Sequence, residues 1–135
     1  MSTTAWKLCR SVFVIVHGAS SPSDQEWDGI LSEYAKYEGM FKGILVLTDG
    51  GMPSSAQRER VTQFWAGKEL PRTAILHSSM FVQGALTALS WILPKQKMKA
   101  FKSTDVAGAL VWLQAEKYRA EIEEAIAKLR MSLNQ

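Results

Sequence analysis

The stretch GILVLTDGGMPSSAQRER, residues 43–60, limits the choice of fold more than any other part of the chain. Its first part, Ile44–Leu47, is apolar at every position, as is typical of a strand that is covered on both faces. Asp49, Gly50 and Gly51 follow, and two consecutive glycines allow backbone conformations with positive φ at no steric cost. The pattern therefore predicts a buried strand that ends in a tight turn.

A helix is expected directly after this turn. Ser54, with Gln57 three residues later, fits a capping box, whereas Pro53 fits a first helical residue, so the two signals place the helix start slightly differently. The first N–H groups of a helix have no partner within it and are available to an anion or a partner. The candidate binding residues of this turn, and of the equivalent turn after a later strand, are Asp49, Gly50, Gly51, Ser54, Ser55, Arg58, His77, Ser78 and Ser79.

Strands and helices alternate along the rest of the chain. Ser23 and Glu26 form a second capping signal, and apolar residues at helical spacing follow it up to Gly39. Further strands are expected at Trp6–Cys9, Val12–Val16, Thr73–Leu76 and Met98–Phe101, and further helices at 54–66, at Met80–Leu93 and from Thr104 onward. This alternation predicts a single α/β domain over residues 1–115, with a mixed, mostly parallel five-strand sheet.

Two histidines and an aspartate follow three of the expected strands. Because right-handed crossovers bring the loops after parallel strands to one edge, His17, Asp49 and His77 are expected where open α/β sheets bind ligands. A metal site, or a serine hydrolase using Ser54 or Ser78, is the enzymatic alternative. The sequence lacks the G-x-S-x-G elbow, and no P-loop lysine follows the double glycine. We therefore expect a chain that is not an enzyme and binds no metal or cofactor.

Residues 116–135 are expected to form a helical extension beyond this domain. The segment has no glycine or proline, and its apolar residues form a stripe on an otherwise charged helix. A helix of this length is marginal alone in water, so it must pack on its own chain or on another. The expected helix Met80–Leu93 lacks a polar face, and the two features together predict a homodimer. The self-association candidates on the stripe are Ile122, Ile126 and Leu129.

Composition places the chain among ordinary globular proteins, with 135 residues, 47% apolar and 21% charged residues, and a net charge of +3. The single cysteine, Cys9, excludes an internal disulfide and fits a reducing compartment. Since the sequence shows neither a membrane-spanning apolar run nor a signal peptide, we expect a cytoplasmic protein. The lysines within residues 95–102 lack the interleaved aromatic residues of a nucleic-acid interface, so we interpret them as a solvated edge.

Four segments that together cover roughly residues 6–113 share a pattern with a known family. They are VFVIVHGASSPSDQEWDGIL, ILVLTDGGMPSSAQRERV, RTAILHSSMFVQGALTALSWI with MKAF, and TDVAGALVWL. They resemble STAS domains, the sulfate-transporter and anti-sigma-factor antagonist family, and especially its stand-alone bacterial members. In phosphorylatable members the acceptor serine opens the helix after the central strand, where Ser54 and Ser55 stand here. The resemblance implies a non-enzymatic role in protein–protein regulation, with a lipid or other small apolar ligand as the alternative.

Overall fold

The computed structural model describes residues 2–77 and 97–133. The strands are β1 (Thr4–Cys9), β2 (Val12–His17), β3 (Gly43–Thr48), β4 (Arg72–His77) and β5 (Met98–Lys102). The helices are α1 (Asp24–Lys36), α2 (Ser55–Trp65), α4 (Val106–Trp112), the short 3-10 helix η2 (Glu116–Tyr118) and α5 (Arg119–Leu133). The helix predicted at Met80–Leu93 lies outside the described residues, as do Ser78 and Ser79.

The five strands form one mixed sheet in the order β1-β2-β3-β4-β5. β1 and β2 are antiparallel, and the two residues between them, Arg10 and Ser11, make the turn, with Arg10 at a positive φ of 55°. β2, β3, β4 and β5 run parallel to one another. The predicted α/β fold with a mixed, mostly parallel five-strand sheet is therefore confirmed.

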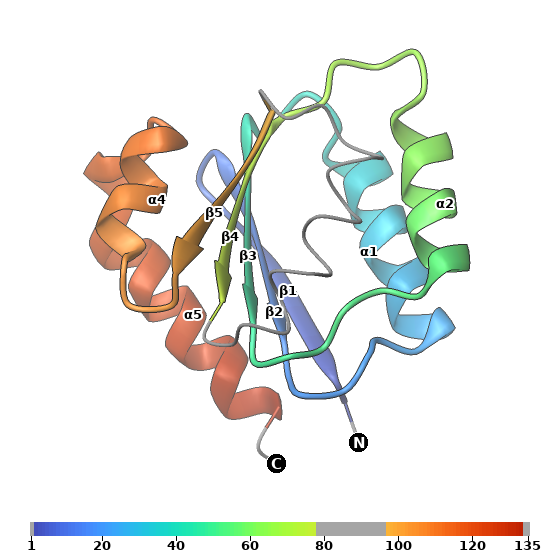
Figure 1. Ribbon diagram of the computed structural model, residues 1–135. Helices are drawn as coiled ribbons and strands as arrows, with labels where there is room; N and C mark the ends of the chain where they lie inside the picture. Colours follow the sequence, from blue (N-terminus) through green and yellow to red (C-terminus); the bar gives the residue numbers. More distant parts are fainter. Residues whose placement is uncertain (1, 78–96, 134–135) are drawn as a thin grey trace.

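Helices cover both faces of the sheet, α1 and α2 on one side and α4 and α5 on the other (Figure 1). Every residue of β2 is buried, and its side chains alternate between the two layers. Phe13 packs against Tyr34 of α1, with ring centroids 4.9 Å apart. Its neighbour Val14 belongs to the opposite cluster, with Leu110 of α4 and Ile122 of α5. Cover on both faces explains why β2 has no polar side to its strand.

Both predicted capping boxes are present. The hydroxyl of Ser23 accepts a hydrogen bond from the N–H of Glu26, and the hydroxyl of Ser54 accepts one from the N–H of Gln57. In each case the side chain of the third residue also bonds back to the N-cap backbone. Ser54 is therefore the N-cap of α2, and the alternative start at Pro53 is wrong because that residue precedes the cap.

α4 ends in a turn that the sequence does not predict, since a continuous helix is expected from Thr104 onward. Gln114 adopts a positive φ of 59°. Its N–H bonds to the carbonyl of Val111, and the N–H of Ala115 bonds to the carbonyl of Leu110. This is a Schellman motif with glutamine where glycine is usual, and both Ala115 and Leu110 are fully buried beside it. The single long helix is thus replaced by two helices with different directions.

α5 packs on β1 and β2 of its own chain. Ile122 is 0% and Ile126 7% exposed there, and Leu129 packs against the same cluster. Packing within the chain therefore covers Ile122 and Ile126, whereas Leu129 is half-buried, and the part of these three residues in self-association stays a prediction. An ion pair between Arg10 and Glu121, with Nε and Oε2 2.6 Å apart, holds α5 against the β1–β2 turn. The homodimer itself stays a prediction without an assigned interface.

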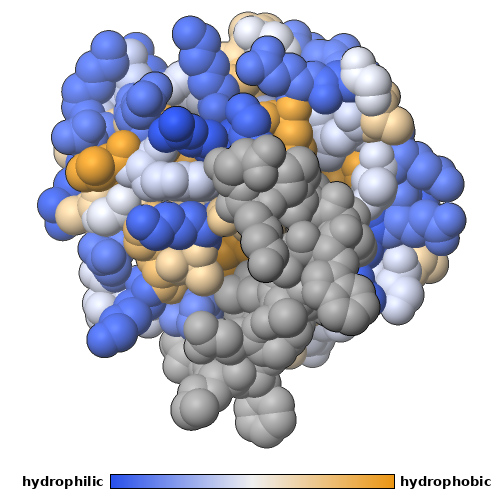
Figure 2. Space-filling view, turned by 45° about the horizontal axis from the view of Figure 1, so that its top comes forward, coloured by the Kyte–Doolittle hydropathy of each residue, from blue (hydrophilic) through white to orange (hydrophobic). Residues whose placement is uncertain are grey.

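The surface of the described residues is largely hydrophilic on the face shown in Figure 2, with apolar atoms scattered between polar ones. β5, the last strand in the sheet order, carries exposed lysines at Lys99 and Lys102. Charged side chains on such a strand disfavour pairing with a strand of another chain. Within residues 2–77 and 97–133, no helix is long and apolar enough to cross a membrane.

Replacing Ile122 with alanine should lower the free energy of unfolding by about 2–5 kcal/mol, because it opens a cavity between α5 and the sheet. The matched control is Met131→Ala on the same helix, where the side chain is 64% exposed. That change should stay within about 0.5 kcal/mol of wild type. Urea denaturation measures both, and equal effects of the two changes would contradict the packing of α5.

Candidate functional site

A row of polar side chains crosses the sheet where β2, β3, β4 and β5 end. The strand register pairs Thr4 with His17, His17 with Thr48, Thr48 with His77, and His77 with Lys102. Because side chains alternate along each strand and paired residues share a face, the whole row lies on one face. That is the face of α1 and α2, since His17 lines the same cavity as Trp27 of α1 and Val61 of α2.

The two histidines do not form a metal site. β3 lies between them, and two strand spacings of about 4.8 Å separate His17 from His77 by roughly 10 Å. Asp49 lines a different hollow together with Arg130. Among the residues that the structure describes, no group of three histidine, cysteine, aspartate or glutamate side chains could hold a metal ion. The alternative of a metal site built from His17, Asp49 and His77 is therefore wrong.

Thr48 and two glycines build the turn between β3 and α2. The Thr48 hydroxyl accepts from the N–H of Gly50 at 3.1 Å and donates to the carbonyl of Gly51 at 2.6 Å. Gly50 has a φ of 127°, which residues with a side chain rarely adopt. Gly51 is needed for close approach instead, because a Cβ there would collide with the carbonyl oxygens of Ser20 and Gly18. The turn is thereby fixed against the loop after β2.

The start of α2 is the exposed part of this region, since Asp49, Ser54 and Ser55 all face solvent. The Ser54 hydroxyl is used for capping. Arg58 bends back toward the helix start, where its Nη1 donates to the carbonyl of Pro53 at 3.0 Å and its Nη2 to the hydroxyl of Ser55 at 3.1 Å. A cation therefore lies beside Ser55, at the end of the helix where the dipole disfavours positive charge.

Gln57 connects the starts of α1 and α2, a role that the sequence does not reveal beyond its place in the capping box. Its side chain is buried, and Nε2 donates to the carbonyl of Pro22 at 2.9 Å and to Asp24 at 3.0 Å. The indole N–H of Trp27 donates to the backbone carbonyl of Gln57 at 2.8 Å. These partners lie at least 30 residues away in the sequence, so no local pattern could identify them.

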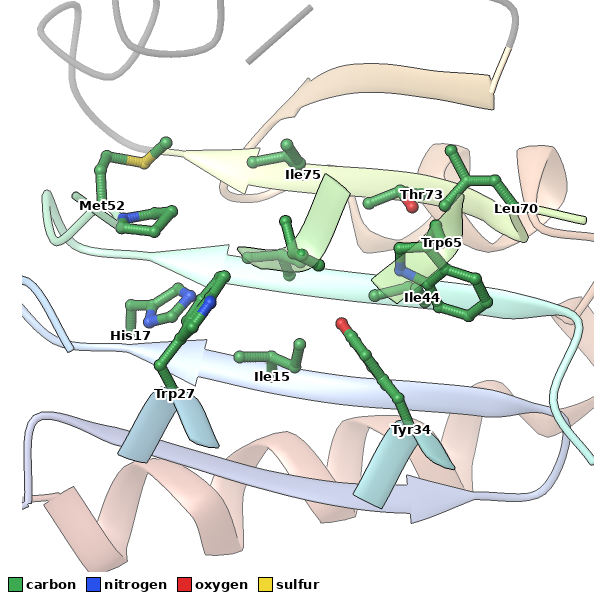
Figure 3. A pocket seen from close by; sticks show the side chains of 13 residues that line it. Ile15, His17, Trp27, Tyr34, Ile44, Met52, Trp65, Leu70, Thr73 and Ile75 are labelled. Atoms are coloured by element: carbon green, nitrogen blue, oxygen red, sulfur yellow. The ribbon is translucent and has the colours of Figure 1, made fainter. Parts of the chain in front are cut away.

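A cavity of about 80 Å³ lies between the α1–α2 layer and strands β2 to β4 (Figure 3). Trp27 and Tyr34 reach into it from α1 and Trp65 from α2, and the Tyr34 hydroxyl points toward the strands (Figure 3). Burial raises the pKa of that hydroxyl well above its usual value. The lining is Ile15, His17, Trp27, Tyr34, Ile44, Val46, Met52, Pro53, Val61, Trp65, Leu70, Thr73 and Ile75.

Burial and hydrogen bonds determine the charge of His17, which lines this cavity, and of Glu26, which binds the start of β1. His17 is 3% exposed, and its Nδ1 lies 2.8 Å from the Thr4 hydroxyl. Burial lowers the pKa of His17 to about 4, against the opposing effect of the Glu26 carboxylate, so the imidazole is neutral at neutral pH. Burial raises the pKa of Glu26, but hydrogen bonds from the Thr3 hydroxyl and from the backbone of Ser23, Thr4 and Thr3 outweigh it and lower that pKa to about 2.

Comparison of the chain with protein-family models, with curated proteins and with solved structures finds no match. What the structure establishes is the fold, with β1 and β2 antiparallel and the other strands parallel. The likeness to STAS domains and the role it implies therefore remain proposals.

The free energy of unfolding should decrease in two steps as the pH is lowered. The contribution of neutral His17 is complete above pH 6.5 and is lost as the pH falls to about 4, because the unfolded chain takes up the proton first. That loss amounts to about 3 kcal/mol. The Glu26 contribution is complete above pH 4.5 and is lost toward pH 2.

Urea denaturation at a series of pH values separates the two steps. His17→Gln should flatten the profile between pH 6.5 and 4, whereas Glu26→Gln should keep that step and lose the lower one. A wild-type protein with constant stability from pH 6.5 to 4 would contradict the burial of a neutral His17.

Gly51→Ala should destabilise the protein by about 2 kcal/mol or more, because the new methyl group meets backbone atoms that have no room to move. Gly18→Ala is the control, since a Cβ there lies 3.5 Å from its nearest neighbour, the Thr3 carbonyl oxygen. Thermal unfolding should show a clear drop for the first variant and a small change for the second. Similar melting temperatures for both variants would show that the turn is not fixed by this contact.

Proposed function

We propose that this chain is a non-enzymatic regulatory domain that binds a protein partner through the β3–α2 turn and the start of α2. The observation that carries the proposal is the exposed pair Ser54 and Ser55, with the Arg58 guanidinium 3.1 Å from the Ser55 hydroxyl. The resemblance to STAS domains supports the same place, because their acceptor serine opens the equivalent helix. The predicted homodimer and cytoplasmic location belong to this proposal.

Phosphorylation of Ser55 offers this surface a physical switch. A phosphate there would meet the positive end of the α2 dipole and would form charge-assisted hydrogen bonds with Arg58. Arg58 would then turn away from the carbonyl of Pro53, which it binds in the unmodified protein. The added charge of about −2 would change the complementarity of the surface toward a partner.

Ser54 would act differently because its hydroxyl already caps the helix. Its backbone N–H donates to the side chain of Gln57, and that same side chain binds Pro22 and Asp24 at the start of α1. A modification of Ser54 would therefore disturb the capping box and the connection between α1 and α2. A modification of Ser55 would thus act on Arg58 at the surface, whereas a modification of Ser54 would act on Gln57 and its bonds to the start of α1.

Ser55→Glu should weaken partner binding at least about tenfold, because it places a carboxylate beside Arg58 in the middle of the surface. Affinity purification from the native source, with quantitative mass spectrometry, compares this variant with wild type. Ser132→Glu is the control, since it adds the same charge to an exposed position on α5, across the sheet. Partners that are depleted only with Ser55→Glu support the proposal, and identical recovery with all three proteins would contradict it.

A further inference from the structure

We propose that β1 is the surface through which two copies of this chain form the predicted homodimer, with the two β1 strands pairing antiparallel about a twofold axis at Trp6. The proposal rests on the homodimer named above and on no feature of the surface around Ser54 and Ser55. Three features lead to it: the direction of the backbone groups of β1, the low charge of this strand and the order of charges on α5.

β1 is the first strand in the sheet order, and among the described residues it pairs only with β2. Along two antiparallel strands, hydrogen-bonded pairs alternate with pairs whose N–H and C=O groups point away from the neighbouring strand. The N–H of Gly18 donates to the carbonyl of Thr3 at 2.9 Å, so Thr3 belongs to a hydrogen-bonded pair. The outward-pointing residues of β1 are therefore Thr4, Trp6 and Leu8.

Two contacts of Thr4 agree with this direction. Its Oγ1 lies 2.8 Å from Nδ1 of His17, as expected in pairs of the second kind, where the side chains are closer. Its N–H donates away from β2, to Oε2 of Glu26 at 3.0 Å. The N–H and C=O groups of Trp6 and Leu8 point the same way, and they have no hydrogen-bond partner within residues 2–77 and 97–133.

The two edges of the sheet differ in charge. β5 exposes Lys99 and Lys102, and lysines on an edge strand disfavour pairing with another chain. β1 exposes only Lys7 among its six residues. Its outward-pointing residues Trp6 and Leu8 have apolar, half-buried side chains that pack under the α1–α2 layer. β1 is therefore the edge that is open to a further strand.

The charge of Lys7 selects the register of two paired β1 strands. With the axis at Lys7, the two lysines would lie directly opposite each other, which is destabilising. With the axis at Trp6, Lys7 lies opposite the partner's Ala5, whose short side chain leaves room for the lysine. The second register therefore places no like charges opposite each other.

The same register matches backbone donors to backbone acceptors. Trp6 exchanges two N–H···O=C bonds with the partner's Trp6, as the residues of a hydrogen-bonded antiparallel pair do. The N–H of Leu8 donates to the carbonyl of the partner's Thr4. The N–H of Thr4 stays with Glu26 inside its own chain. Both outward N–H groups that lack a partner, those of Trp6 and Leu8, thereby gain one.

The charges of α5 favour a second copy over an unrelated strand as the partner. α5 packs on β1 and runs antiparallel to it. Glu121 binds Arg10 at one end of the strand, and Arg130 lines a hollow with Thr3 at the other. The first half of α5 carries three glutamates and one arginine, whereas its second half carries Lys128 and Arg130 and no acid. A twofold axis at the middle of β1 brings the acidic half of each helix toward the basic half of the other.

Ala5→Lys tests the interface by placing a lysine opposite the partner's Lys7. Because the like-charged pair forms twice about the axis, the dissociation constant of the dimer should rise about tenfold. Sedimentation velocity between about 1 and 100 µM measures this constant for wild type and variant. Ala100→Lys is the matched control, since it makes the same change at an exposed position of the other edge strand and should leave the constant unchanged.

A charge reversal tests the register itself. Adding Lys7→Glu to Ala5→Lys places opposite charges across the axis and should restore at least the wild-type affinity. Lys7→Glu alone should change the dissociation constant less than about twofold, because it lies opposite an alanine. Recovery by the second change would also show that the Ala5→Lys variant is folded.

Hydrogen exchange of the wild-type protein tests the interface without a substitution. The backbone amides of Trp6 and Leu8 should exchange slowly at about 100 µM and faster on dilution, since only the dimer bonds them. The amides of Ala5 and Lys7 belong to hydrogen-bonded pairs with β2 and should be protected at every concentration.

Four outcomes would overturn the proposal. A wild-type protein that is monomeric at about 100 µM would exclude the homodimer, while partner binding at Ser55 would stand or fall by its own test. A dimer with the same affinity in wild type and Ala5→Lys would place the interface elsewhere. Failure of Lys7→Glu to restore the affinity of that variant would exclude the register. Protection of the Trp6 and Leu8 amides only when another protein is added would assign the edge to a strand of that protein.

Discussion

Burial of both faces of β2, β3 and β4 is the constraint on which the rest of this structure depends. Strands that are apolar on both sides cannot face water, so each face requires its own helical layer. α1 and α2 supply one layer, and α4 and α5 supply the other. The left-handed turn at Gln114 makes the second layer complete, because it ends α4 and lets α5 return across β1 and β2.

The candidate sites depend on a second set of contacts, at the edge where the parallel strands end. Gly51 packs against the backbone of Gly18 and Ser20, and Gln57 binds Pro22 through its side chain. Two turns that are distant in sequence are therefore joined into one unit. Met52 and Pro53, which lie between this turn and the exposed start of α2, line the cavity.

His17 shows how position in the sheet decides the chemistry of a residue. The sequence places it after a strand, as a candidate ligand or base. The sheet places it under α1 with Thr4 as its partner, and burial keeps it neutral. Its imidazole is neutral and bonded to Thr4, and among the described residues no group of three histidine, cysteine, aspartate or glutamate side chains could hold a metal ion there. Strand β3 also separates His17 from His77, so the two imidazoles are not placed to share a metal ion.

By itself, the sequence determined the parts of this protein that local chemistry controls. The apolar run Ile44–Leu47 predicted a buried strand, and the serine and glutamine at positions 54 and 57 predicted the start of α2, because period, capping and turn preferences act over a few residues. Only the tertiary structure decided the break at Gln114, the intrachain burial of Ile122 and the long-range hydrogen bonds of Gln57. Each of these depends on partners far away in the chain, and the free energy of such contacts leaves no pattern in the neighbouring residues.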